Sequence, residues 1–93
     1  MAKGDYSTER FAQNLRDLRT EQTFSQEFLA RRSGVHASEI SRLEKGERDP
    51  RLTTIVKLAK GLRVGVESLT DGVTGPPKPP LPPIDIHSDE WQL

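Results

Sequence analysis

The sequence predicts an all-α fold, with five short helices in a compact domain over residues 1–72 and a proline-rich C-terminal extension over residues 73–93. Three observations support this prediction. Apolar residues recur at helical spacing in successive segments. Ser, Gly and Pro stand between these segments, where helices begin and end. Six of the seven prolines fall within residues 75–83, a run that favours extended polyproline II over helix.

The first helix is expected from residue 7 or 8 to about residue 22. Phe11, Leu15 and Leu18 lie at positions i, i+4 and i+7, so they share one helical face. This face is expected to pack against the other helices.

The second helix is expected over residues 26–33. Ser25 precedes it and can accept a free backbone N–H as the N-cap. Phe24 and Leu29 have the spacing of a hydrophobic staple. Gly34 follows, where the chain must turn sharply and a positive φ suits glycine.

The third helix is expected over residues 37–44, with Lys45 and Gly46 as stop signals. Val35, Ile40 and Leu43 supply an inward stripe. The residues left facing outward are Ala37, Ser38, Ser41 and Arg42. Two short helices joined by a tight turn, the second with a polar outer face, form a helix-turn-helix.

The fourth helix is expected over residues 52–62, after Pro50, which disfavours helix at the residue before it. Its inward residues are expected to be Leu52, Ile55, Leu58, Ala59 and Leu62. Gly65 can cap a short fifth helix over residues 66–70.

Composition narrows the class of protein. The chain has no cysteine, so neither a disulfide framework nor a thiolate metal site is expected. His36 and His87 lie in different regions, and the paired carboxylates Asp89 and Glu90 have no pocket to tune them. We therefore expect no enzyme, no cofactor and no metal.

The polar start and the lack of a long apolar run predict no signal peptide or membrane anchor, and hence a cytoplasmic protein.

The formal net charge is zero, but the charge is unevenly distributed. Residues 31–63 carry nine basic and four acidic side chains, whereas residues 84–93 carry three acidic side chains and no Lys or Arg. Phosphate binding depends on the local field rather than on the total. The central region is therefore compatible with nucleic acid, although solvated helix faces would give the same pattern.

Residues along most of the chain match a known family in type and order. In the two-helix core they are Gln26, Ala30, Gly34, Val35, Ile40 and Leu43. Upstream stand Arg16-Asp17-Leu18-Arg19, and downstream stand Glu44-Lys45-Gly46, Pro50, Leu58-Ala59 and Leu62. Over roughly residues 8–71 the chain therefore resembles the xenobiotic-response-element family of bacterial and phage regulators, with a lambda-repressor-like DNA-binding domain.

The resemblance implies that residues 37–44 form a recognition helix. The candidates for base contact are Ala37, Ser38, Ser41 and Arg42. The Arg42 guanidinium can donate two hydrogen bonds to guanine O6 and N7, the serine hydroxyls suit any base, and the Ala37 methyl suits thymine. The alternative for Arg42 is a phosphate contact or plain solvation.

The candidates for phosphate contact are Gln26, Lys45, Arg48 and Arg51. Gln26 begins a helix, where its amide and the free backbone N–H groups can meet a phosphate oxygen, as the resemblance also implies. Glu47 and Asp49 interrupt the basic loop, which lowers the expected affinity. The resemblance further implies an ion pair between Arg19 and Glu44 that ties the first helix to the end of the recognition helix.

Four positions depart from the family pattern. Relatives usually have Gly where Thr23 stands, so the sequence does not fix the exact end of the first helix. They also commonly have Gly near Arg63 and a hydroxyl residue near Gly65, so the turn between the fourth and fifth helices is expected to be unusual. His36 stands where a Ser or Thr N-cap is preferred; it can cap weakly, and Glu39 could bond back to it. Phe28 replaces an often polar residue and is expected in the core, with the tail or a partner as alternatives.

These features predict a sequence-specific double-stranded DNA-binding transcriptional regulator, most simply a repressor, acting as a homodimer on an inverted repeat. By resemblance, the dimer interface is expected around Leu62, Val64, Val66 and Leu69. One alternative is an antitoxin-like protein that neutralises a partner and represses its own operon. Another is an interaction module that has lost DNA binding, for which the acidic Glu47 and Asp49 would be the sign.

The last residues are acidic but carry large apolar side chains at Ile84, Ile86 and Trp91. A stiff proline-rich segment could carry these side chains onto the far side of the domain, onto a dimer mate or onto a second protein. A solvated extension is the alternative.

Overall fold

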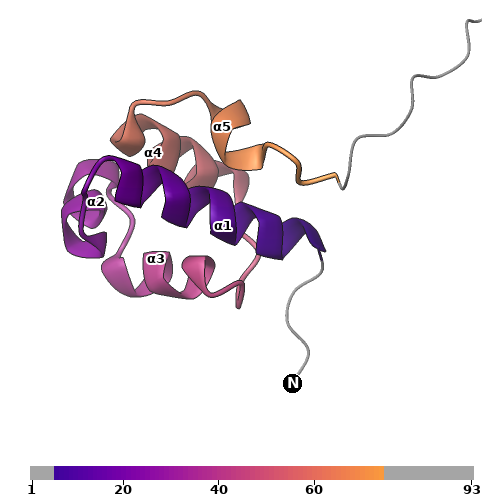
Figure 1. Ribbon diagram of the computed structural model, residues 1–93. Coiled ribbons are helices and arrows are strands. Elements are labelled where there is room, and N and C mark those ends of the chain that lie inside the picture. The colour runs from indigo at the N-terminus through magenta and orange to yellow at the C-terminus, as the bar shows by residue number, and fades with distance from the viewer. Residues whose placement is uncertain (1–5, 75–93) are drawn as a thin grey trace, which may run out of the picture.

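The computed structural model describes residues 6–74, which form five α-helices and no strand. The helices are α1 (Tyr6–Glu21), α2 (Gln26–Ser33), α3 (Ala37–Glu44), α4 (Leu52–Leu62) and α5 (Val66–Thr70). α1 runs across the domain with α3 beneath it and α5 above, while α2 packs against α3 and α4 near the C-terminal end of α1 (Figure 1). The predicted all-α fold is confirmed, whereas the proline-rich extension lies outside the described residues.

The predicted bounds of α2, α3, α4 and α5 coincide with those of the structure, and α1 differs by one or two residues at its ends. Local contacts explain this agreement. The Ser25 Oγ accepts a hydrogen bond from the backbone N–H of Phe28 at 2.9 Å, as expected of an N-cap. Gly34 ends α2 at φ 81°, and its N–H bonds to the carbonyl of Ala30.

Two turns use non-glycine residues in the left-handed region. Thr23, which follows α1, and Arg63, which caps α4, both have φ 59°. The resemblance implies a glycine at the first position and near the second. The unusual turn expected between α4 and α5 is present, and α1 ends at Glu21, one residue before the expected end. An L-residue in this region costs roughly 1–2 kcal/mol, which the surrounding helix packing must offset.

The core draws side chains from all five helices and from the turn between α2 and α3. Its buried members are Phe11, Leu15, Leu29, Val35, Ile40, Leu43, Leu58, Ala59, Leu62 and Leu69. Leu52 was expected among them, but it is 71% exposed, so that prediction is wrong. Leu52 opens α4, and the core covers this helix from Ile55 onward. Helical periodicity gives the direction of a side chain, but not whether another element lies opposite it.

Side chains from the first half of α1 hold the end of α5 and the turn after it. The buried Asn14 Nδ2 donates to the carbonyls of Leu69 and Asp71, both at 2.8 Å. Ser7 Oγ donates to the carbonyl of Val73 at 2.7 Å. The bonds from Asn14 satisfy carbonyls that the short helix leaves free at its C-terminus, and the bond from Ser7 holds the turn that follows.

Gly61 lies where α4 approaches α2 closely. A Cβ atom at this position would lie 2.9 Å from Ser33 Cβ and 3.1 Å from Ser33 Cα. The Gly61 carbonyl also accepts a hydrogen bond from Arg32 Nε at 2.6 Å. Glycine therefore permits the contact between these two helices, despite its poor helix propensity.

We expect Gly61→Ala to lower the free energy of unfolding by about 1–2 kcal/mol, because overpacking outweighs the gain in helix propensity. Urea denaturation checks this expectation. Lys60→Ala, at the exposed neighbouring position, is the control and should change stability by less than about 0.5 kcal/mol. A Gly61→Ala variant more stable than the parent would contradict the close approach.

Candidate nucleic-acid interface

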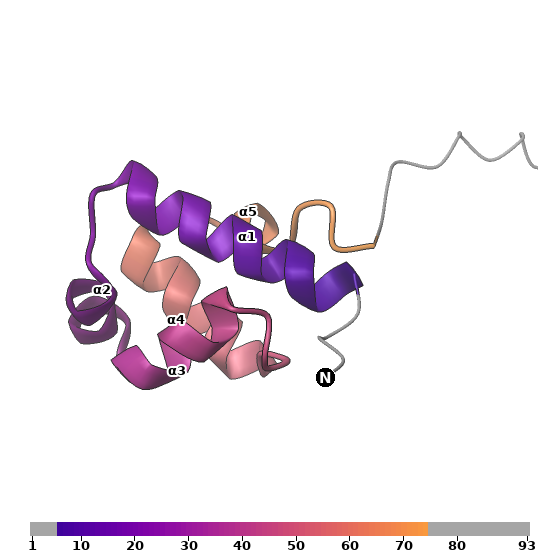
Figure 2. The same cartoon turned by 60° about the horizontal axis from the view of Figure 1, so that its bottom comes forward.

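α3 has one buried face and one accessible face. Ile40 and Leu43 are fully buried beneath it. On its outer side Ser38 and Arg42 are exposed, and Ala37 and Ser41 are half-buried. Figure 2 shows α3 on the near side of the domain, in front of α4. The four residues predicted to contact bases therefore share an accessible surface.

Arg42 is unengaged within the described part of the chain. No hydrogen bond or ion pair involving its side chain occurs among residues 6–74. Its guanidinium carries five N–H donors in a planar fork. An exposed fork without a partner is able to bind a base edge or a phosphate without first breaking an internal contact.

The loop from α3 to α4 places more cations beside this face. Lys45, Arg48 and Arg51 are all exposed, and Arg51 is the N-cap residue of α4. Arg48 Nη1 lies 3.7 Å from Glu39 Oε1, with both side chains partly exposed. Such a pair contributes only ~0–1 kcal/mol, so a phosphate oxygen can compete with Glu39 for this guanidinium.

Asp49 has a structural contact besides its position in the basic loop, and one expectation about His36 needs correction. Asp49 Oδ1 accepts a hydrogen bond from Thr8 Oγ1 at 2.5 Å. This carboxylate therefore ties the loop to the start of α1. His36 precedes α3 as the N-cap residue but makes no side-chain capping bond, and Glu39 contacts Arg48.

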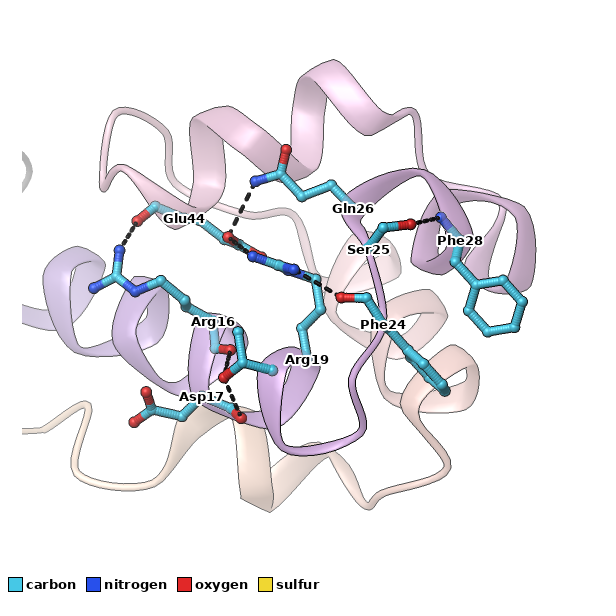
Figure 3. A network of polar contacts seen from close by, with 9 residues as sticks. Arg16, Asp17, Arg19, Phe24, Ser25, Gln26, Phe28 and Glu44 are labelled. Carbon is cyan, nitrogen blue, oxygen red and sulfur yellow. Dashed lines mark hydrogen bonds and ion pairs between the residues drawn. The ribbon is translucent and has the colours of Figure 1, made fainter.

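The predicted ion pair between α1 and α3 is present and bidentate. Arg19 Nε lies 2.6 Å from Glu44 Oε2, and Arg19 Nη2 donates to Glu44 Oε1 at 2.9 Å (Figure 3). The side chains are 14% and 5% exposed. The hydrogen bond to Glu44 raises the pKa of the Arg19 guanidinium above its ordinary value, against the opposing effect of burial. A planar fork on a carboxylate fixes orientation as well as distance.

Further bonds extend this pair into a network at the end of α3. Gln26 Nε2 donates to Glu44 Oε1 at 3.1 Å, and Arg19 Nη1 donates to the carbonyl of Phe24 at 2.8 Å (Figure 3). Arg16 Nη1 donates to the backbone carbonyl of Glu44 at 3.2 Å. These bonds, which we call the Glu44 network, join α1, the start of α2 and the last turn of α3.

The hydrogen bond between Gln26 and Glu44 could not be predicted from the sequence. The two residues are 18 positions apart, and no local sequence pattern links residues at that separation. A glutamine amide has two N–H donors, so one remains after the bond to Glu44. Because Gln26 is the first residue of α2, this donor lies beside the free backbone N–H groups of that helix end.

The residues predicted for a dimer interface divide into two groups. Leu62 and Leu69 are 1% and 0% exposed and belong to the core of their own chain. Their assignment to a dimer interface is wrong, because both side chains are covered within their own chain. An apolar sequence pattern does not distinguish a core position from an interface position. Val64 and Val66 are half-buried and pack at the edge of the core. They stay candidates.

Residues 6–74 contain no group of three or more His, Cys, Asp or Glu side chains placed to hold a metal ion. None of the helices in that range is long and apolar enough to cross a bilayer.

Comparison of sequences finds relatives of this chain. The transcriptional repressor RghR of Bacillus subtilis (strain 168) is 45% identical over 62 residues, which are 66% of this chain and 46% of that protein. The control protein C.SmaI of Serratia marcescens is 41% identical over 61 residues, which are 66% of this chain and 73% of its own length. The match therefore spans less than half of the repressor but most of the control protein.

Solved structures agree with this grouping. The restriction-modification controller protein C.AhdI from Aeromonas hydrophila has a TM-score of 0.65 and 40% identity, covering 67% of this chain and 94% of its own. The hypothetical transcription factor NHTF from Neisseria has a TM-score of 0.66 and 29% identity, covering 75% and 83% of the two chains. The family model HTH_3, described as helix-turn-helix, matches residues 15–69. The chain therefore belongs to the HTH_3 helix-turn-helix family, the xenobiotic-response-element type that its sequence resembles.

Proposed function

We propose that this protein is a sequence-specific double-stranded DNA-binding transcriptional regulator that acts as a repressor, in the form of a homodimer on an inverted-repeat operator. The observation that carries the proposal is the outer face of α3. Arg42 is exposed and unengaged within the described residues, and the exposed Lys45 and Arg51 follow it. Relatives named as repressors and controllers support the same class of function.

The proposed mechanism divides the work between two sets of side chains. Phosphate contacts from Gln26, Lys45, Arg48 and Arg51 would set the position of the domain on the duplex, without reading sequence. Arg42, Ser38 and Ser41 would then reach base edges in the major groove, with Ala37 against a thymine methyl. The hydrogen bonds of Arg16, Arg19 and Gln26 to Glu44 would hold α3 at a constant angle to the start of α2, where Gln26 would contact a phosphate.

Selection of bound duplexes from a random pool at low salt tests this proposal. The expected result is an enriched motif with two inverted half-sites about one helical turn apart. A pool that remains random after several rounds would reject specific binding and leave an interaction module as the better description.

The dimer part of the proposal concerns Val64, which precedes α5, and Val66, which begins it. One helix-turn-helix reads a few base pairs, so two copies are the usual arrangement on an operator. Val64 and Val66 are partly accessible apolar side chains at the edge of the core, as a pairing surface requires.

We expect Val66→Asp to weaken self-association and operator affinity together, because a carboxylate placed in an apolar contact must be desolvated. Sedimentation equilibrium measures the first quantity, and titration of a full operator against a single half-site measures the second. Val66→Thr, which keeps the shape without the charge, is the control. A protein that stays monomeric at high concentration, yet binds a palindrome in one step, would contradict this arrangement.

A second candidate function has the same mode of DNA binding but a different set of regulated genes. Two relatives named as control or controller proteins are matched over 73% and 94% of their own lengths. This coverage favours a regulator of the restriction-modification controller kind. Mapping the selected motif onto the source genome distinguishes the two candidates, since a controller's sites would lie beside restriction and methyltransferase genes.

A further inference from the structure

An aromatic pair lies at the start of α2, with Phe24 at the edge of the core and Phe28 at the surface. Phe24 and Phe28 meet edge to face, with ring centroids 4.8 Å apart and an interplanar angle of 63°. Phe28 is 38% exposed, so the expectation that it belongs to the core is wrong. Figure 3 shows both rings on the opposite side from the Glu44 network. Leu29 fills the inward position of α2, which leaves Phe28 beside it at the surface.

Two arginines of α2 place their guanidinium groups over these rings. The Arg32 guanidinium carbon lies 5.2 Å from the Phe24 centroid and 5.9 Å from that of Phe28, and the Arg31 carbon lies 5.9 Å from the Phe28 centroid. Neither arginine forms an ion pair with a carboxylate within residues 6–74. We name Phe24, Phe28, Arg31 and Arg32 the α2 aromatic surface.

This surface fits a ligand that is both apolar and acidic. Contact with an aromatic or aliphatic side chain removes the exposed Phe28 ring from water, which is favourable. Carboxylates next to the two guanidinium groups can accept charge-assisted hydrogen bonds from them. A neutral or basic peptide would leave one of these two features unmatched.

Residues 84–93, which lie outside the described part of the chain, have this composition. They contain Ile84, Ile86, Trp91 and Leu93 together with Asp85, Asp89 and Glu90, and no Lys or Arg. These residues therefore supply both apolar side chains for the rings and carboxylates for the guanidinium groups.

The length of the chain allows this contact. The described residues end at Thr74, beside the start of α1, as the bond between Ser7 and Val73 requires. α2 lies toward the other end of α1 (Figure 1). Ile84 lies ten residue steps after Thr74, and at about 3.1 Å per step in polyproline II this stretch spans roughly 30 Å. A domain of about 70 residues is roughly 28 Å across, so the segment can reach the far end.

We propose that residues 84–93 dock on the α2 aromatic surface of the same chain, with Trp91 or the isoleucines against Phe28 and the carboxylates beside Arg31 and Arg32. The interaction is independent of the DNA-binding proposal, because it uses none of the side chains assigned to the duplex.

The emission of Trp91 in the full-length protein tests this interaction, because it is the sole tryptophan. The expected spectrum is blue-shifted and protected from acrylamide. Phe28→Ser and Arg31→Glu should each move the emission to longer wavelength and increase quenching. Asp89→Lys combined with Arg31→Glu should restore part of the protection. Far-UV circular dichroism and urea denaturation confirm that the variants fold.

Tyr6→Ser is the matched control, since Tyr6 is another exposed aromatic residue at the opposite end of α1, and it should leave the spectrum unchanged. Three results would overturn the proposal. A water-like spectrum in the parent protein would mean that the segment does not dock. A blue-shifted spectrum insensitive to Phe28 and Arg31 would place the segment elsewhere. A spectrum that changes with protein concentration would assign the contact to a second copy.

Discussion

Replacing Glu44 with Ala is expected to lower the free energy of unfolding by about 3 kcal/mol, because a largely buried ion pair loses one partner. The Arg19 guanidinium would keep its bond to the Phe24 carbonyl but lose two bonds to the carboxylate. Gln26 would lose its acceptor as well. Urea denaturation of the free protein measures this loss.

Glu39→Ala is the matched control for Glu44→Ala. It also removes a glutamate from α3, but that glutamate contacts Arg48 at 3.7 Å on a partly exposed surface. Its loss should therefore be within ~0–1 kcal/mol. A double-mutant cycle with Arg19→Ala then isolates the coupling between the two side chains. If Glu44→Ala costs no more than Glu39→Ala, the pair is not effectively buried in solution.

Replacing Arg42 with Ala is expected to weaken binding to the selected operator by about 1–3 kcal/mol and to relax the preference at one base position. Within residues 6–74 the Arg42 side chain has no hydrogen-bond or ion-pair partner, so its removal should change folding stability by less than about 0.5 kcal/mol. Operator titrations together with a repeated duplex selection measure both effects.

Lys45→Ala supplies the comparison for Arg42→Ala, because Lys45 is an exposed cation three residues further along the chain. It should weaken binding to all sequences about equally and reduce the slope of log affinity against log salt by about one. If Arg42→Ala shows this same pattern, Arg42 contacts phosphate and base recognition belongs to other side chains of α3.

The Glu44 network explains why these two predictions are linked. Arg16 and Arg19 reach from α1 to the last residue of α3, and Gln26 reaches the same residue from the start of α2. A change at Glu44 should therefore shift the angle of α3 as well as destabilise the fold. We infer that a stability defect and a binding defect will appear together in Glu44→Ala but separately in Arg42→Ala.

The Arg19–Glu44 pair was expected from the resemblance, not from any local pattern. Its two members are 25 residues apart, and helical periodicity relates residues no more than a few turns apart. The bonds from Asn14 to the end of α5 and from Thr8 to Asp49 had no signal in the sequence at all. Each depends on how two helices lie against each other.

The two ends of α2, in contrast, were determined by the sequence alone. Ser25 and Gly34 set the two ends of α2 through contacts with residues at most four positions away. Such contacts form within one turn of backbone, so the residues at which the helix begins and ends depend little on the rest of the chain.

Only the tertiary structure decided which apolar side chains are covered and which polar side chains meet. Leu52 has the spacing of a core residue and is exposed, whereas Leu62 and Leu69 were assigned to an interface and are buried. The exposure of Phe28 likewise depends on Leu29 occupying the inward position of α2. The physical reason is that burial requires a second element at the right distance and angle, and the position of that element is set by the packing of the whole domain.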